Sequence, residues 1–103
     1  MKINFEQVLV DLKGENIKDG RDGQGEILKL KTVCVNSLLS DFQDERSTGE
    51  EKVERYELAK KIHAGGEIDL KTEKIAMLKQ RVGKLYLPIV VGQVYEMLEG
   101  KKK

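Results

Sequence analysis

The segment that most constrains the fold is YLPIVVGQVYEML, residues 86–98. Seven of its thirteen residues are aliphatic or Met and two are Tyr, in a chain of which 36% of the residues are charged. On a helical wheel its apolar side chains cover an arc of roughly 160°, whereas a helix that packs on one neighbour needs about 100°. A helix of this kind must therefore be covered on more than one side.

Two explanations account for this arc. In the first, the segment is the central helix of the protein and is wrapped by the other helices and the sheet. In the second, part of the arc is exposed in the monomer and binds another chain, since soluble monomers rarely leave a large apolar patch uncovered. The candidate partner-binding residues are Ile89, Val91, Tyr95 and Leu98. The opposite, polar side of the wheel carries Gly92, Gln93, Glu96 and Glu99.

The length of 103 residues suffices for one hydrophobic core. We expect a single small domain, with a β-hairpin region at 1–31, a helical region at 32–100 and a disordered basic tail at 101–103. No apolar run is long enough to span a membrane, and no signal-peptide core follows Met1. We therefore expect a cytoplasmic protein without a membrane partner, and virion association is left open.

The first third of the chain has the pattern of a small β element. Residues 7–12 alternate in polarity with a period of two, which places Val8, Val10 and Leu12 on one side of a strand. Residues 27–30 predict a second strand. Between them DGRDGQGE, residues 19–26, is typical of a flexible hairpin loop and matches neither a calcium loop nor a dinucleotide fingerprint.

From Thr32 onward the apolar period becomes that of helices. Thr32 is the expected N-cap of the first helix, and the sequence Thr48-Gly49-Glu50-Glu51 is a capping box that starts a second helix. Gly65-Gly66 stops this second helix. The residues expected on the buried faces of these two helices are Val35, Leu38, Leu39 and Phe42, followed by Val53, Tyr56, Ala59 and Ile62.

Two more helices follow a short extended piece at Ile68 and Leu70. One begins at Thr72, and the other begins at Pro88 and runs to Leu98, because the residue before a proline is disfavoured in a helix. The expected apolar stripe of the helix that begins at Thr72 is Ile75, Leu78, Val82, Leu85 and Tyr86. The predicted fold class is therefore α+β, with an N-terminal β-hairpin or small meander packed on a bundle of about four short helices.

The sequence offers little for catalysis. His63 is the only histidine, and it falls in the last turn of a charged helix, where histidine commonly complements the helix C-terminus. Cys34 is the only cysteine, and a position between two valines favours a small buried thiol. We therefore predict a protein that is not an enzyme, with no catalytic, cofactor-binding or metal-binding residues and no small-molecule substrate.

A basic edge on the third predicted helix gives the alternative function. It consists of Lys71, Lys74, Arg81 and Lys84, to which the tail Lys101-Lys102-Lys103 adds. The last two helices have the outline of a helix-turn-helix, but the second of them offers base edges little beyond Gln93. Contact of this edge with phosphate would make the protein a regulator that binds nucleic acid or nucleoprotein, although a pI near 7.8 disfavours this.

Three segments resemble a type of small protein encoded by tailed bacteriophages and prophages. They are SLLSDFQDE (37–45), GEEKVERYELAKKI (49–62) and LKQRVGKLYLPIVVGQVYEMLEG (78–100). The resemblance implies an accessory or assembly protein made in the cytoplasm of a bacterial host, and it supplies no catalytic or ligand residues. Together with the apolar arc, it predicts a protein–protein interaction module that binds a protein partner or itself through its C-terminal helices.

Overall fold

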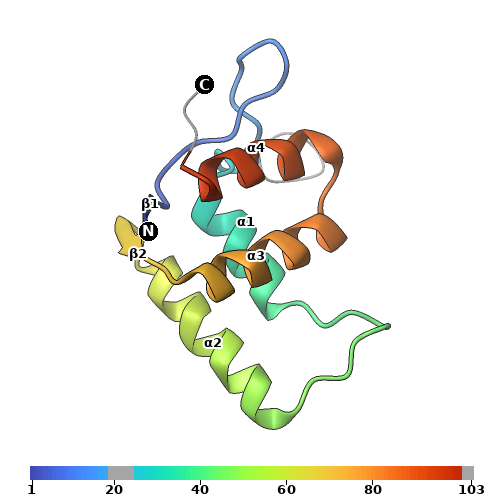
Figure 1. Ribbon diagram of the computed structural model, residues 1–103. Helices are drawn as coiled ribbons and strands as arrows, with labels where there is room; N and C mark the ends of the chain where they lie inside the picture. Colours follow the sequence, from blue (N-terminus) through green and yellow to red (C-terminus); the bar gives the residue numbers. More distant parts are fainter. Residues whose placement is uncertain (19–24, 101–103) are drawn as a thin grey trace.

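The computed structural model describes residues 1–18 and 25–100 (Figure 1). Within these residues the fold is α+β, as predicted, with four helices and a two-stranded antiparallel sheet. The elements are β1 (Lys2–Asn4), α1 (Leu30–Leu39), α2 (Gly49–His63), β2 (Glu67–Asp69), α3 (Thr72–Leu85) and α4 (Pro88–Leu98). Most of the predicted hairpin loop, residues 19–24, and the tail at 101–103 lie outside the described residues.

The sheet joins the start of the chain to the connection between α2 and α3. In its antiparallel register Ile3 lies opposite Ile68, and both side chains are buried. The N-terminal ammonium group adds a bond of 2.7 Å to Asp69 Oδ1 and one of 3.0 Å to the carbonyl oxygen of Leu70. The sequence predicted an extended piece at Ile68 but not its partner, because the two strands are far apart along the chain.

The meander predicted for residues 7–30 forms through isolated bridges rather than through regular strands. The backbone N–H of Leu9 donates to Leu28 at 2.9 Å, that of Ile17 donates to Leu9 at 3.0 Å, and that of Leu28 donates to Ile17 at 2.7 Å. The prediction of which residues of the first strand face the core was wrong. Leu9 is completely buried, whereas Leu12 is 94% exposed, because a turn begins at Asp11 and directs Leu12 outward.

The start and end of α2 are as predicted, but its buried face is not. Thr48 and Glu51 form the capping box, in which each side chain accepts from the backbone N–H of the other residue at 3.1 Å. Val53 and Tyr56 were expected in the core and are instead 57% and 52% exposed. The residues of α2 that are buried are Arg55, Leu58, Ala59 and Ile62.

The boundaries of α1 differ from the prediction. The helix begins at Leu30 and has Lys29 rather than Thr32 as its N-cap, and it ends before Phe42. Leu39, expected inside, is 57% exposed. Cys34 is completely buried, as expected, and this burial raises the pKa of its thiol to about 12.

All four helices contribute to one core. Helix α1 packs against α2 and α3, and α3 packs against α4 (Figure 1). The break before Pro88 lies where it was predicted, so α4 can turn back across α3. The completely buried hydrophobic residues are Phe5, Leu9, Leu30, Val33, Cys34, Ile62, Leu78, Val82, Val94 and Leu98.

Two buried arginines bind the C-terminal end of α1. Arg55 of α2 donates through Nη1 to the carbonyl oxygens of Leu38 at 3.1 Å and Ser40 at 2.9 Å. Arg81 of α3 donates through Nε to Ser37 at 2.8 Å and through Nη2 to Ser40. Carbonyl groups at the end of a helix have no partner within the helix. The guanidinium groups supply these partners and thereby join three helices.

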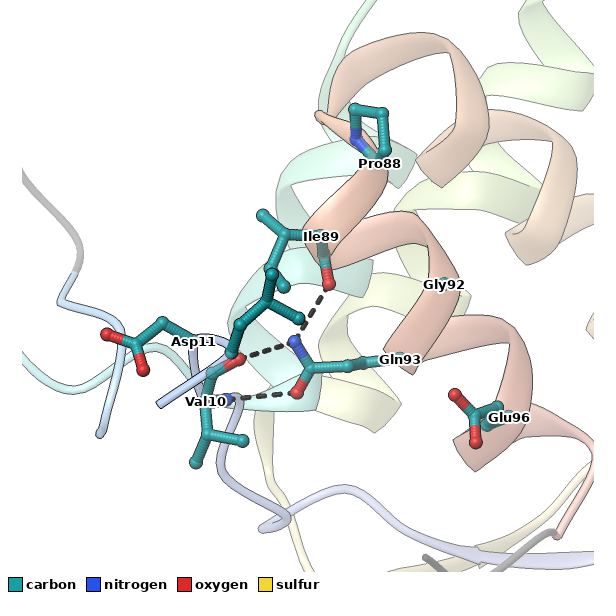
Figure 2. Close-up of a pocket in the computed structure, with 8 residues that line it drawn as sticks. Val10, Asp11, Pro88, Ile89, Gly92, Gln93 and Glu96 are labelled. Atoms are coloured by element: carbon teal, nitrogen blue, oxygen red, sulfur yellow. Dashed lines mark hydrogen bonds between the residues drawn. The ribbon is translucent and has the colours of Figure 1, made fainter. Parts of the chain in front are cut away.

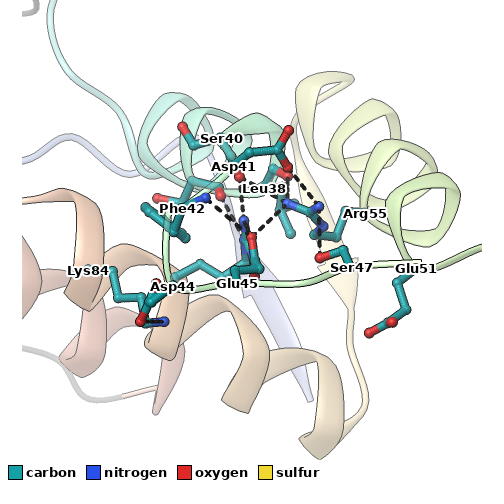
Figure 3. Close-up of polar contacts among 12 residues, drawn as sticks. Leu38, Ser40, Asp41, Phe42, Asp44, Glu45, Ser47, Glu51, Arg55 and Lys84 are labelled. Carbon is teal, nitrogen blue, oxygen red and sulfur yellow. Dashed lines mark hydrogen bonds and ion pairs between the residues drawn. The ribbon is translucent and has the colours of Figure 1, made fainter. Parts of the chain in front are cut away.

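The loop after α1 also contacts these arginines, and Figure 3 shows its residues beside Arg55. Arg81 forms an ion pair with both carboxylate oxygens of Glu45, and Arg55 donates to Asp41 Oδ1 at 3.1 Å. The ring of Phe42 lies 4.8 Å from the guanidinium carbon of Arg81. Hydrogen bonds from Arg81 hold the pKa of Glu45 at about 2, below its ordinary value of 4.5.

The Glu45–Arg81 pair predicts a pH-dependent stability difference between the wild type and Glu45→Gln. Because the pKa of Glu45 is lower in the folded state, its contribution is complete above about pH 4.5 and is lost as the pH falls toward about 2. At pH 7 the variant should lose about 1–3 kcal/mol of unfolding free energy. Urea denaturation from pH 7 to pH 2 measures how this difference closes.

The control is Glu15→Gln, which removes one exposed carboxylate from a turn. Other carboxylates titrate equally in the wild type and in each variant, so their effects cancel in the difference. A difference between wild type and Glu45→Gln that stays constant from pH 7 to pH 2 would contradict a stabilising role for ionised Glu45.

Candidate interaction surface

Most of α4 is covered by the rest of the protein. Val90, Val94 and Leu98 are buried, and Val91 and Tyr95 are half-buried. The hydroxyl group of Tyr95 donates to the carbonyl oxygen of Lys79 at 3.0 Å. The first explanation of the apolar arc, a central helix wrapped by its own fold, therefore accounts for most of α4.

The four candidate partner-binding residues are consequently not equivalent. Leu98 has no exposed surface, so its selection as a contact residue was wrong. Val91 and Ile89 are half-buried against the core, and Tyr95 is held by its bond to α3. Among these four, Ile89 lines an open groove at the surface.

Gln93 builds one wall of that groove. It was expected on the polar side of α4, yet only 5% of it is exposed. Its Oε1 accepts from the backbone N–H of Val10 at 3.0 Å, and its Nε2 donates to the carbonyl oxygens of Val10 at 2.6 Å and Ile89 at 2.8 Å (Figure 2). The side chain thus pairs with Val10 as a neighbouring strand would, and fixes the N-terminal segment against α4.

We call the resulting depression the turn–α4 groove. Its volume is ≈ 500 Å³. The residues that line it are Val10, Asp11, Leu12, Pro88, Ile89, Gly92, Gln93 and Glu96. A Cβ atom added at Gly92 would meet no other atom within 4 Å, so the glycine leaves the groove open (Figure 2).

The groove combines apolar walls with negative charge. The turn that carries Leu12 is held in place because Asp11 Oδ1 accepts from the backbone N–H groups of Lys13 at 2.9 Å and Glu15 at 3.0 Å. Asp11 and Glu96 are the charged residues that line the groove. The surface therefore fits an aliphatic side chain that is accompanied by a positive charge.

The predicted basic edge does not form a row of unpaired cations. Arg81 is buried at the end of α1, so its selection as a phosphate contact was wrong. Lys84 bonds to Asp44 at 3.1 Å, and Lys74 lies 4.0 Å from Glu54. Lys71 is exposed. The burial of Arg81 could not be predicted from the sequence, because arginine is usually exposed.

The two groups considered for nucleophilic chemistry lie in different environments. The thiol of Cys34 is buried, and the rise of its pKa to about 12 disfavours the reactive thiolate at neutral pH. His63 is exposed at the last position of α2.

Among the described residues, none of the helices combines the length and the apolar character that a membrane span requires. Comparisons of the chain with protein-family models, with curated proteins and with solved structures found no match. The turn–α4 groove is therefore interpreted from its own geometry.

The role of Gln93 is tested by two neighbouring substitutions. Gln93→Leu should lower the unfolding free energy by about 1–3 kcal/mol, because it removes the partners of the Val10 backbone. Gly92→Ala should instead raise it by up to about 1 kcal/mol, because alanine favours a helix interior and its Cβ meets nothing.

Urea denaturation measures both stabilities, and hydrogen exchange of the Val10 amide locates the effect. The amide should exchange faster in Gln93→Leu than in the wild type and should keep its wild-type rate in Gly92→Ala. An unchanged Val10 rate in Gln93→Leu would show that the side chain does not hold this segment.

Proposed function

We propose that the protein is a non-enzymatic protein–protein interaction module that binds a partner in the turn–α4 groove. The observation that carries this proposal is the open turn–α4 groove, which Leu12 and Ile89 line together with Asp11 and Glu96, and in which Leu12 is exposed. A single exposed leucine is ordinary. The backbone on both sides of Leu12 is fixed, by the bonds of Val10 to Gln93 and of Lys13 to Asp11, so only the side-chain rotamers of Leu12 must be ordered when a partner docks.

The charges of the groove support a particular kind of partner. Because Asp11 and Glu96 both carry negative charge, a segment with Lys or Arg beside an aliphatic side chain would match it in charge and in polarity. The proposal keeps the C-terminal helices as part of the binding surface. It narrows the contact from four residues spread along α4 to the part of the helix that lines the groove, around Ile89.

The setting proposed for this activity is a bacterial host that carries a phage or prophage. The segment 78–100, which resembles phage and prophage proteins, includes α4 and so provides one wall of the groove. We propose an accessory or assembly protein that acts in the host cytoplasm on a phage or host protein. Recovery of the partner from purified virions would place the complex in the particle.

Site-specific photocrosslinking tests the proposal. A photoreactive phenylalanine analogue at Gly92 points into open space within the groove, and one at Ala76, an exposed residue of α3, serves as the control. In cells that naturally make the protein, the probe at 92 should form a covalent adduct with another protein, and the probe at 76 should not. Mass spectrometry of the adduct identifies the partner.

A second substitution connects the adduct to the groove. Leu12→Asp should abolish crosslinking from position 92 and leave the fold intact, since Leu12 is 94% exposed. Three results would count against the proposal: no adduct at position 92, the same adducts at both positions, or an adduct that Leu12→Asp does not affect.

A further inference from the structure

We infer that the outer face of α2 binds a second copy of the chain. Val53 and Tyr56 lie three positions apart on this helix, and they are 57% and 52% exposed. Leu39 of α1 lines a groove together with Tyr56 and is 57% exposed. The face therefore presents three large apolar side chains on two neighbouring helices, at a distance from α4 in the fold (Figure 1).

Helix α2 forms a ridge between two grooves. The groove on the α1 side has a volume of ≈ 280 Å³ and includes Val35, Leu39 and Tyr56. The groove on the α3 side has a volume of ≈ 480 Å³ and includes Val53 and Leu58. The exposed side chains of α2 lie between these two grooves. In a two-fold arrangement, α2 of each copy can therefore lie along a groove of the other.

The charges on α2 favour an antiparallel orientation of the α2 helices of the two copies. Glu54 and Glu57 border the groove on the α3 side, and Lys60 and Lys61 follow them in the last turns of the helix. A two-fold axis that crosses α2 at the level of Leu58 brings Glu54 and Glu57 of one helix close to Lys61 and Lys60 of the other. A parallel arrangement would bring like charges together. Closed dimers of identical chains commonly use such a two-fold axis.

The charged side chains can change partners at little cost. Within one copy, Lys60 lies 3.5 Å from Glu57 and Lys74 lies 4.0 Å from Glu54, and these side chains are well exposed. Exposed ion pairs contribute little to stability. The opposite side of α2 is fixed by the buried Arg55, so the outer face is presented by a rigid helix.

Sedimentation equilibrium of the purified chain tests this inference. The wild type should show a monomer–dimer equilibrium, and Tyr56→Glu and Val53→Glu should each raise the dissociation constant at least tenfold. Both side chains are more than half exposed, so the variants should fold, which circular dichroism and thermal unfolding verify. Leu12→Asp, in the turn–α4 groove, is the control and should leave the dimer unchanged.

Charge-reversed variants test the antiparallel orientation. Glu54→Lys combined with Glu57→Lys should weaken the dimer, and so should Lys60→Glu combined with Lys61→Glu. The quadruple variant that reverses all four charges should dimerise with itself as the wild type does, because acidic and basic parts again meet. It should not form mixed dimers with the wild type, because like charges then meet in the antiparallel arrangement.

A wild-type chain that stays monomeric up to about 1 mM, a concentration at which a contact of about 4 kcal/mol is populated, overturns the inference. A dimer that is insensitive to Tyr56→Glu also overturns it. A dimer that Leu12→Asp disrupts would assign the second copy to the turn–α4 groove and likewise contradict a role for α2. Mixed dimers between the wild type and the quadruple variant would reject the antiparallel arrangement, because only parallel helices would then bring opposite charges together.

Discussion

Arg55 and Arg81 meet at the C-terminal end of α1, where each guanidinium group would be costly to bury without partners. The carbonyl oxygens that the helix leaves unpaired accept their hydrogen bonds, and Glu45 and Asp41 supply the opposite charge. Within the described residues, no buried side-chain nitrogen or oxygen atom is left without a hydrogen-bond partner. These hydrogen bonds and ion pairs link α1, α2 and α3 through two arginine side chains, which a hydrophobic pattern would assign to the surface.

Helix α2 buries Arg55 together with Leu58, Ala59 and Ile62. With this face turned to the core, Val53 and Tyr56 lie toward solvent. At the other end of the molecule, Gln93 has a corresponding role, because its amide fixes the Val10 segment and so defines the turn–α4 groove. In both places a buried polar side chain joins the element that carries the exposed apolar surface to the rest of the fold.

The ends of helices that depend on residues close in the sequence were predicted correctly. The capping box at Thr48, the stop at Gly65 and the break before Pro88 each act within a few residues, and each lies where the sequence placed it. The pairing of β1 with β2, and the burial of Gln93, depend on partners more than 60 residues away. No periodicity encodes such partners. The candidate site was predicted in part, since Ile89 lines the groove but the contribution of Leu12 depends on a turn whose phase was not foreseen.

The linkage of α1, α2 and α3 depends most on the binding of Arg81 to the end of α1 in solution. Nuclear magnetic resonance of the arginine side-chain Nε–H groups tests this directly, because the Nε–H of Arg81 donates to Ser37 at 2.8 Å whereas Arg46 is exposed. The account predicts that the Nε–H of Arg81 exchanges with water much more slowly than that of Arg46 at the same pH. Equal exchange rates for the two groups would contradict it.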